Sequence, residues 1–201
     1  MGMSMGMVSI YNQDCVACPL SKTRTQIVWY RGNPKAKIML IGEAPGKQED
    51  LEGLPFVGRS GALLDEALFA SFGFNFLDYV YITNMVKCRP PENRNPTHAE
   101  LNECSPFLQA ELDAVKPSLV ILLGKVACEK VIKRPVRITK EHGILVLLDA
   151  KTWGIPCLHP AYILRNQKPK ITNSFFQVFL DAKEVVYGAG PNSEVFKENT
   201  Y

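Results

Sequence analysis

Strand-sized apolar runs that alternate with helical patterns are the feature that most constrains how this 201-residue chain folds. Apolar, β-branched and aromatic residues predict strands at 37–41, 79–83, 118–123, 144–148 and 155–158. Helical spacing predicts helices at 60–73, 97–115, 124–132 and 174–186, with Ser60 and Thr97 as N-caps of the first two. This alternation predicts an α/β fold, a three-layer α/β/α sandwich around a central, mostly parallel sheet of four to five strands.

The composition is that of an ordinary globular protein. Hydrophobic residues make up 46% and charged residues 21%, which excludes a disordered, collagenous or coiled-coil chain. The length predicts one domain over residues 1–201, with poorly ordered ends at 1–10 and 188–201. The net charge of +3, from 23 basic and 20 acidic residues, permits nucleic-acid binding without requiring it.

The expected compartment follows from two patterns that the sequence lacks. No apolar run approaches the roughly 18 residues of a membrane span, and the first seven residues do not form a secretory signal. We therefore expect a cytoplasmic protein without a membrane partner, and we expect it to be a monomer. In a reducing compartment, grouped cysteines are more often metal ligands than disulfides.

Four of the expected strands end in small or polar residues: Gly42, Asn84, Gly124 and His159. Ligands of open parallel sheets bind beyond the carboxyl ends of the strands, so these four ends predict a site at one edge of the sheet. His159 also precedes a proline, so its side chain should project from that edge. Arg165 adds a basic side chain shortly after it.

Four cysteines have a spacing that suits a metal centre. Cys15 and Cys18 form a C-x2-C pair, and Cys88 and Cys104 bracket a loop and the first turns of a helix. A four-thiolate zinc site and a 4Fe-4S cluster both fit this set, and two unrelated pairs of buried thiols are the alternative. The other two cysteines are expected in the core: Cys128 and Cys157.

A glycine-rich loop follows the first expected strand, over residues 42–58. It matches neither a P-loop nor the dinucleotide-binding fingerprint. Glu43 and the Glu49–Asp50 pair offer carboxylates that could activate water, although we expect Asp50 to cap a helix and Glu49 to be solvated. Phe56 suits either a core position or a platform for stacking.

The loop after the second expected strand carries polar and basic side chains. Asn84 offers a donor and an acceptor that suit the edge of a nucleobase, or it caps a turn. Lys87, Arg89 and Arg94 suit contacts with phosphates, or they are solvated charges. Taken alone, this loop favours the second interpretation, an Asn that caps a turn beside solvated charges.

These motifs, in this order, resemble family 4 of the uracil-DNA glycosylase superfamily, the iron-sulfur uracil-DNA glycosylases. The matching segments are C-V-A-C-P, G-E-A-P-G-K-Q-E-D with G-L-P-F-V-G-R-S-G, I-T-N-M-V-K-C-R-P-P-E-N-R, L-L-G-K-V-A and H-P-A-Y-I-L-R-N. Together with Cys104 they spread from residue 15 to about residue 166, and their joint occurrence makes the resemblance specific.

The resemblance implies a role for each matching residue. A 4Fe-4S cluster would be held by four thiolates: Cys15, Cys18, Cys88 and Cys104. The uracil and its scissile bond would be surrounded by a loop of three residues: Gly42, Glu43 and Ala44. Phe56 would stack on uracil, Asn84 would pair with its Watson–Crick edge, and His159 would donate to its O2.

The resemblance also implies a hydrolase, a monofunctional DNA N-glycosylase that catalyses the first step of base excision repair. Uracil in single- or double-stranded DNA would be flipped out, and hydrolysis of its N-glycosidic bond would leave an abasic site. Arg165 or Leu164 would fill the gap in the duplex. Ala44 stands where the best-studied superfamily members carry a water-activating Asp, which leaves Glu43 as the candidate base.

Two other functions are compatible with parts of the sequence. One is a non-catalytic iron-sulfur protein of the same fold that binds nucleic acid, and the intact set of Glu43, Phe56, Asn84 and His159 argues against it. The other is a zinc-bearing hydrolase of phosphate esters or nucleotides, but four thiolates leave no open position on the metal. No motif identifies the enzymes that would process the abasic product.

Overall fold

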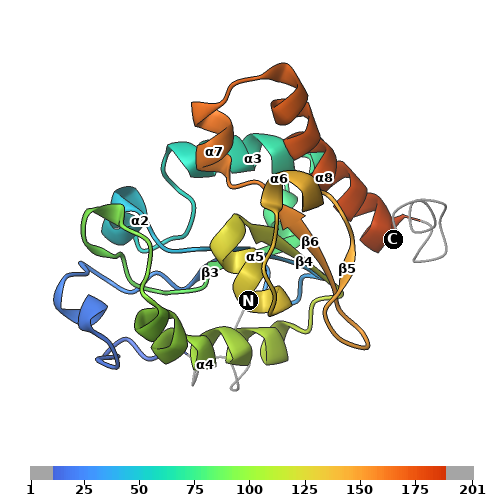
Figure 1. Cartoon of the computed structure of the whole chain (residues 1–201). Coiled ribbons are helices and arrows are strands. Elements are labelled where there is room, and N and C mark those ends of the chain that lie inside the picture. The colour runs from blue at the N-terminus through green and yellow to red at the C-terminus, as the bar shows by residue number, and fades with distance from the viewer. Residues whose placement is uncertain (1–10, 189–201) are drawn as a thin grey trace.

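The computed structural model describes residues 11–188, in which one six-stranded sheet is covered by helices on both faces (Figure 1). The strands are β1 (Tyr30–Gly32), β2 (Ile38–Gly42), β3 (Val80–Asn84), β4 (Leu119–Leu123), β5 (Val146–Leu147) and β6 (Trp153–Cys157). The predicted poorly ordered ends, 1–10 and the residues after 188, lie outside the described part.

The strand order is β1-β3-β2-β4-β6-β5. The four inner strands β3, β2, β4 and β6 are mutually parallel, whereas the edge strands β1 and β5 pair antiparallel. The predicted α/β class and mostly parallel sheet are therefore confirmed, with six strands in place of four to five. β1 is missing from the prediction because it has only three residues, Tyr30, Arg31 and Gly32, which give no periodic pattern.

Sequence patterns predict four helices and miss the short helices at 47–52, 138–141 and 160–165. The described residues form seven helices in all. They are α2 (Lys47–Glu52), α3 (Arg59–Phe72), α4 (His98–Val115), α5 (Lys125–Ile132), α6 (Ile138–Glu141), α7 (Pro160–Arg165) and α8 (Pro169–Tyr187). Three short 3₁₀ segments complete them: η1 (Pro19–Lys22), η2 (Phe76–Asp78) and η3 (Pro91–Asn93). Thr97 caps α4 as predicted, but the N-cap of α3 is Gly58 and not Ser60. No helix within residues 11–188 is long and apolar enough to cross a membrane.

The inner strands are buried on both faces because their residues alternate between two helix layers. Ile38 and Leu40 of β2 belong to the core that includes residues of α3, α7 and α8. Met39 and Ile41 belong to the core that includes residues of α4 and α5. Figure 1 shows α3, α7 and α8 on one side of the sheet and α4 on the other. The sandwich therefore has the three predicted layers.

The parallel register sets the ends of the strands at one edge. Gly42 at the end of β2 is paired with Asn84 at the end of β3. Leu123 at the end of β4 is paired with Cys157 at the end of β6, and the N–H of Gly124 donates to the Cys157 carbonyl at 2.8 Å. The loops that carry the predicted site residues therefore start from the same edge of the sheet.

Candidate active site

Gly42, Phe56 and Asn84 converge where β2 and β3 end. A Cβ atom on Gly42 would lie 2.4 Å from Asn84 Oδ1 and 2.4 Å from Phe56 Cζ, far inside van der Waals contact. Phe56 is buried and has a φ of 56°, in the left-handed region that side chains other than glycine seldom adopt. The absence of a side chain at Gly42 is what lets an aromatic ring and an amide approach each other here.

Glu49 of α2 holds the glycine-rich loop in shape. Its carboxylate accepts backbone N–H groups from Gly46 at 3.0 Å, from Val57 at 3.0 Å and from Gly58 at 2.8 Å. The predicted solvated position of Glu49 is wrong, because its side chain is buried by these contacts. The loop on either side of Phe56 is thereby fixed by one carboxylate.

Asp50 is buried as well, but it does not cap its own helix as expected. Its carboxylate accepts the backbone N–H of Thr25 at 2.9 Å and of Gln26 at 3.5 Å. It therefore attaches the segment that follows Cys15 and Cys18 to α2.

Asn84 presents a buried amide with unused hydrogen-bonding capacity. Its side chain is 1% exposed, and within the described residues its Oδ1 has no hydrogen-bond partner. A buried acceptor without a partner costs free energy, which a bound donor would recover. The amide beside the Phe56 ring is therefore suited to a planar, polar ligand.

His159 has its tautomer set by the backbone. It is the N-cap of α7, and its Nδ1 accepts the N–H of Ala161 at 3.1 Å. A ring nitrogen that accepts carries no proton, so in the neutral ring the proton lies on Nε2, which can donate to a ligand. Burial, with a smaller contribution from the Arg165 cation, lowers the pKa of His159 to about 4. His159 is therefore neutral at pH 7.

The His159 ring belongs to the same group of side chains. Its centroid is 6.0 Å from that of Phe56, at an interplanar angle of 33°. A Cβ on Gly124 would lie 3.3 Å from His159 Cβ, so the glycine after β4 makes room for the histidine. The loop after β2, the end of β3 and the start of α7 thus bring Phe56, Asn84 and His159 to one place, although they are distant in sequence.

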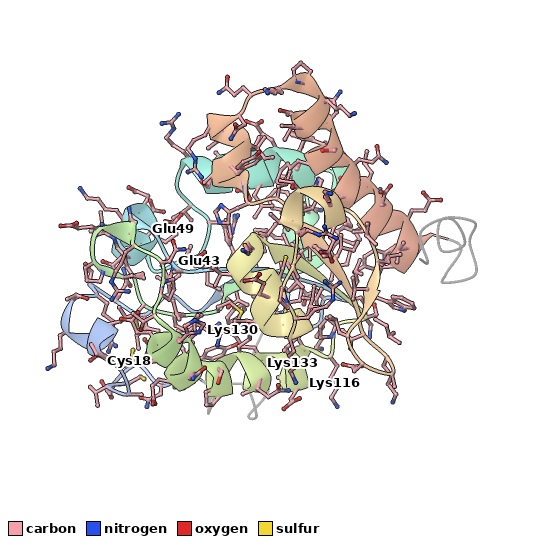
Figure 2. All side chains as sticks on the ribbon, viewed as in Figure 1. Cys18, Glu43, Glu49, Lys116, Lys130 and Lys133 are labelled. Atoms are coloured by element: carbon pink, nitrogen blue, oxygen red, sulfur yellow. The ribbon has the colours of Figure 1, made fainter. Side chains whose placement is uncertain are left out.

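Glu43 follows β2 directly and is half-buried. Burial raises the pKa of its carboxyl group above the usual range. Figure 2 shows Glu43 and Glu49 on the same side of the molecule, on the loop after β2 and on α2. Ala44, the next residue, packs against the core on the α4 side. Its methyl group has no atom that could accept a proton, so it cannot activate water. In contrast to Glu49 and Asp50, whose carboxylates bind backbone amides, Glu43 is available for another role.

Lys87 does not lie on the surface, contrary to the predicted phosphate contact. Its ammonium donates to Glu111 Oε2 at 2.6 Å, to Thr83 Oγ1 at 2.6 Å and to the carbonyl of Asn84 at 2.7 Å. The side chain is 2% exposed, and all three ammonium protons are used. Lys87 is therefore a positioning residue that fixes the backbone of Asn84, and the predicted DNA contact is wrong.

The three arginines predicted to contact DNA have different surroundings. Arg89 is half-buried and donates to Asn93 Oδ1 at 2.7 Å. Arg94 forms two hydrogen bonds to the Glu100 carboxylate, at 2.9 and 2.7 Å, so its charge is largely compensated. Arg165 is exposed at the end of α7, close enough to lower the pKa of His159. Arg165 is thus the predicted contact whose cation lies exposed beside the site.

The four predicted ligand cysteines line one small cavity: Cys15, Cys18, Cys88 and Cys104. Arg24 Nη1 lies 3.5 Å from Cys88 Sγ, and the backbone N–H of Lys87 donates to Cys104 Sγ at 3.4 Å. Trp29 also lines the cavity, and its buried indole N–H has no partner among residues 11–188. Donors directed at sulfur are typical of iron–sulfur sites, where they adjust the potential of the cluster.

The donor set fits a thiolate-bound metal group. Burial raises the pKa of the Cys104 thiol to about 11 and also raises the pKa of the Cys88 thiol, where the Arg24 cation offsets part of the shift. A metal would therefore have to displace both protons. Among the described residues, no three Cys, His, Asp or Glu side chains are close enough together to hold a single metal ion. The remaining cysteines, Cys128 and Cys157, are fully buried in the core as predicted.

Sequence reasoning missed the partner of Lys87. Glu111 lies on α4 among the buried positions Leu108 and Val115, at the three- and four-residue spacing of the apolar face. A carboxylate at a core position is the indication that a buried cation faces it. The role of Glu49 could have been inferred from its place three residues after Gly46, since an N3 glutamate often bonds the N-cap amide.

Several known proteins have sequences similar to this chain. The family model described as the uracil DNA glycosylase superfamily matches residues 29–182. A type-4 uracil-DNA glycosylase of Thermotoga maritima is 39% identical over 187 residues, covering 92% of this chain and 96% of the relative. One of Archaeoglobus fulgidus is 42% identical over 160 residues, 75% of this chain and 78% of the relative. A type-5 uracil-DNA glycosylase of Pyrobaculum aerophilum is 36% identical over 134 residues, 57% of this chain and 58% of the relative.

The buried ion pair gives a prediction about stability. Glu111→Gln should lower the free energy of unfolding by about 3–5 kcal/mol, because it leaves the Lys87 ammonium buried without a counter-charge. The double variant Lys87→Met with Glu111→Leu should lose less, since no charge is left behind. Urea unfolding measures both, and Glu66→Gln on the exposed face of α3 is the control, expected to change stability by less than about 0.5 kcal/mol. Equal losses in the single and double variants would contradict the assignment.

Proposed function

The chain belongs to the uracil-DNA glycosylase superfamily and is a uracil-DNA glycosylase, and we propose that it hydrolyses the N-glycosidic bond with Glu43, Phe56, Asn84 and His159. The glycosidic bond inside a duplex is out of reach, so the uracil nucleotide leaves the stack and enters the pocket at the sheet edge. The products are free uracil and an abasic site.

The environment of Asn84 supports its role in recognising uracil. Uracil offers a donor at N3 and an acceptor at O4, which a side-chain amide can pair with at once. The unpartnered, buried Oδ1 of Asn84 supplies the acceptor for N3–H. Cytosine has an acceptor at N3 and a donor at C4, so a fixed amide would leave polar groups unpaired. The Phe56 ring next to the amide provides the face on which the base stacks.

His159 supports departure of the base. As the glycosidic bond breaks, negative charge gathers on the leaving uracil, and a donor at O2 stabilises this charge more than it stabilises the ground state. The Nε2–H of neutral His159 is such a donor, because Nδ1 is occupied by the Ala161 N–H. A neutral imidazole donates to the uracil anion without giving up its proton.

Glu43 is the group that we assign to the attacking water. Its half-buried carboxyl lies on the loop directly after β2, next to Gly42. An ionised carboxylate there can orient a water molecule and stabilise the positive charge that develops on the sugar. Arg165 and Leu164 on α7 are the candidates for the gap in the duplex, with Arg89 and Arg94 as outer phosphate contacts.

We also propose that Cys15, Cys18, Cys88 and Cys104 hold a 4Fe-4S cluster, as the type-4 relatives suggest. When bound, the cluster would crosslink the segments that carry its four thiolate ligands. It would take no part in catalysis, because its ligands are separate from the residues assigned to uracil. Two ligands precede β1, Cys88 lies in the loop between β3 and α4, and Cys104 lies in α4, so the thiolates would join segments that are distant in sequence.

The observation that carries the proposed function is the placement of a neutral, Nε2-protonated His159 and an unpartnered Asn84 amide around one aromatic ring. The direct test is incubation with an oligonucleotide that holds a single uracil, either single-stranded or opposite guanine, followed by alkali. Strand scission only after alkali establishes a monofunctional glycosylase. Scission without alkali, or intact DNA that still binds the iron-containing protein, would refute it.

Replacement of the recognising amide should impair excision. Asn84→Asp should lower kcat/KM on uracil-containing DNA by about 10–10²-fold. The buried carboxylate removes the donor that O4 needs, and the lost hydrogen bond raises the activation free energy by about 1–3 kcal/mol or more. Asn75→Asp, the same change at an exposed position, is the control and should keep wild-type activity. Near wild-type activity of Asn84→Asp would show that the pocket assignment is wrong.

The pH dependence of kcat/KM should reflect the ionisation of the Glu43 carboxyl group. The active form is the carboxylate, whose pKa burial raises, so kcat/KM should fall as the pH drops through a value above the usual range of glutamate. Glu43→Gln should lose about 10²-fold or more and should lack this acid limb. His159→Asn should also be impaired but keep the limb, since His159 stays neutral down to about pH 4. An unchanged limb in Glu43→Gln would exclude Glu43 as the base.

The cluster assignment predicts the metal content of two variants. Purified wild-type protein should be brown and contain iron, and Cys88→Ser should lose colour, iron and thermal stability together. Cys128→Ser, at a buried cysteine of the core, should keep the iron. A colourless wild-type protein with stoichiometric zinc, or a Cys88→Ser protein with full iron content, would refute the assignment.

A further inference from the structure

A groove of about 770 Å³ lies between α4, α5 and the segment that joins β5 to β6. This volume is within the range of about 300–1,000 Å³ that is usual for ligand sites. None of the residues assigned to uracil or to the cysteine cavity lines it. The groove is therefore separate from the active site, and glycosylase chemistry does not explain it.

Four lysines line the groove: Lys116, Lys130, Lys133 and Lys151. Lys116 ends α4, Lys130 and Lys133 lie at the end of α5, and Lys151 comes from the β5–β6 turn. Figure 2 shows Lys116, Lys130 and Lys133 gathered around α4 and α5, away from Glu43 and Glu49. Three separate segments thus contribute cations to one groove.

Two of these lysines have an unfavourable backbone conformation. Lys116 and Lys133 are the C-caps of α4 and α5, with φ values of 52° and 60°. Glycine is the usual residue at such left-handed helix ends, and the Cβ atom of another residue makes this conformation less favourable. The negative ends of the two helix dipoles offset part of this cost. The helix dipoles do not explain why Lys151 lies at the groove, because this lysine is in a turn.

The acidic residues of the groove do not neutralise it. Asp149 already accepts the backbone N–H groups of Lys151 at 2.8 Å and Thr152 at 3.0 Å. Asp113 accepts the side-chain amide of Gln109 at 3.0 Å. Four lysines against two aspartates leave a formal charge of +2, so the groove favours an anionic ligand.

The floor of the groove is aliphatic. Its apolar side chains include Leu101, Leu108, Leu112, Val120 and Leu148, and Leu147 on the rim is 57% exposed. The lining has no aromatic residue. Single-stranded nucleic acids bind on aromatic stacking platforms, so this composition favours another anionic partner. A peptide with both carboxylates and aliphatic side chains matches the rim and the floor together.

We propose that this groove binds an acidic segment of a partner protein. Aliphatic side chains of the segment pack on the leucine floor, and its carboxylates face Lys116, Lys130, Lys133 and Lys151. Binding at this place leaves Asn84 and His159 uncovered, since neither lines the groove. The glycosylase can therefore hold a partner while it acts on DNA.

The test uses the full chain with its metal and a fluorescein-labelled peptide of alternating aspartate and leucine. Fluorescence polarisation should show binding that weakens with salt, and Lys116→Glu with Lys133→Glu should weaken it by about tenfold or more. A peptide with serine in place of leucine should bind more weakly. Lys35→Glu with Lys140→Glu, at exposed lysines outside the groove, is the charge-matched control and should bind as the wild type does.

Two further measurements distinguish a loss of peptide binding from a loss of folding or of glycosylase activity. Thermal unfolding must show that the Lys116→Glu, Lys133→Glu protein is folded, and its uracil excision should equal that of the wild type. Absence of peptide binding to the wild type, or equal loss in the control pair, overturns the proposal. So does a double variant that loses affinity for uracil-free single-stranded DNA but not for the peptide, because the groove would then be a nucleic-acid surface.

Discussion

The shared register of four parallel strands is the constraint on which the rest of this structure depends. Because β2, β3, β4 and β6 run in one direction, their carboxyl ends lie at one edge, and each contributes a loop there. A glycine at the end of β2 leaves space into which Phe56 and the Asn84 amide both project. The convergence of these side chains is thus a consequence of strand direction and of one missing side chain.

A buried ion pair connects this pocket with the cysteine cavity. The Lys87 ammonium bonds Glu111 of α4 and the carbonyl of Asn84, while the Lys87 amide bonds Cys104. The same residue therefore holds the backbone of Asn84, the amide that we assign to uracil, and one predicted metal ligand. Such a pair contributes less to net stability than to fixing one arrangement, because both charges lose their hydration.

Burial shifts the pKa values of His159 and Glu43 in opposite directions. Removal from water disfavours charge, so the imidazole of His159 stays neutral and donates, while the carboxyl of Glu43 is harder to ionise. The hydrogen bond from Ala161 decides which nitrogen of His159 keeps its proton. Electrostatics and one backbone amide thus prepare the site before any substrate binds.

The sequence alone determined the α/β class, and it predicted the sheet edge and the side chains that we assign to the site, because apolar periodicity and loop position are local properties. It did not determine that Lys87 turns inward to Glu111 or that Glu49 holds the glycine-rich loop. Only the tertiary structure decided these, since the direction of a long polar side chain depends on which partner lies across the core. For the same reason the groove lysines, which come from three segments, form a group only after folding.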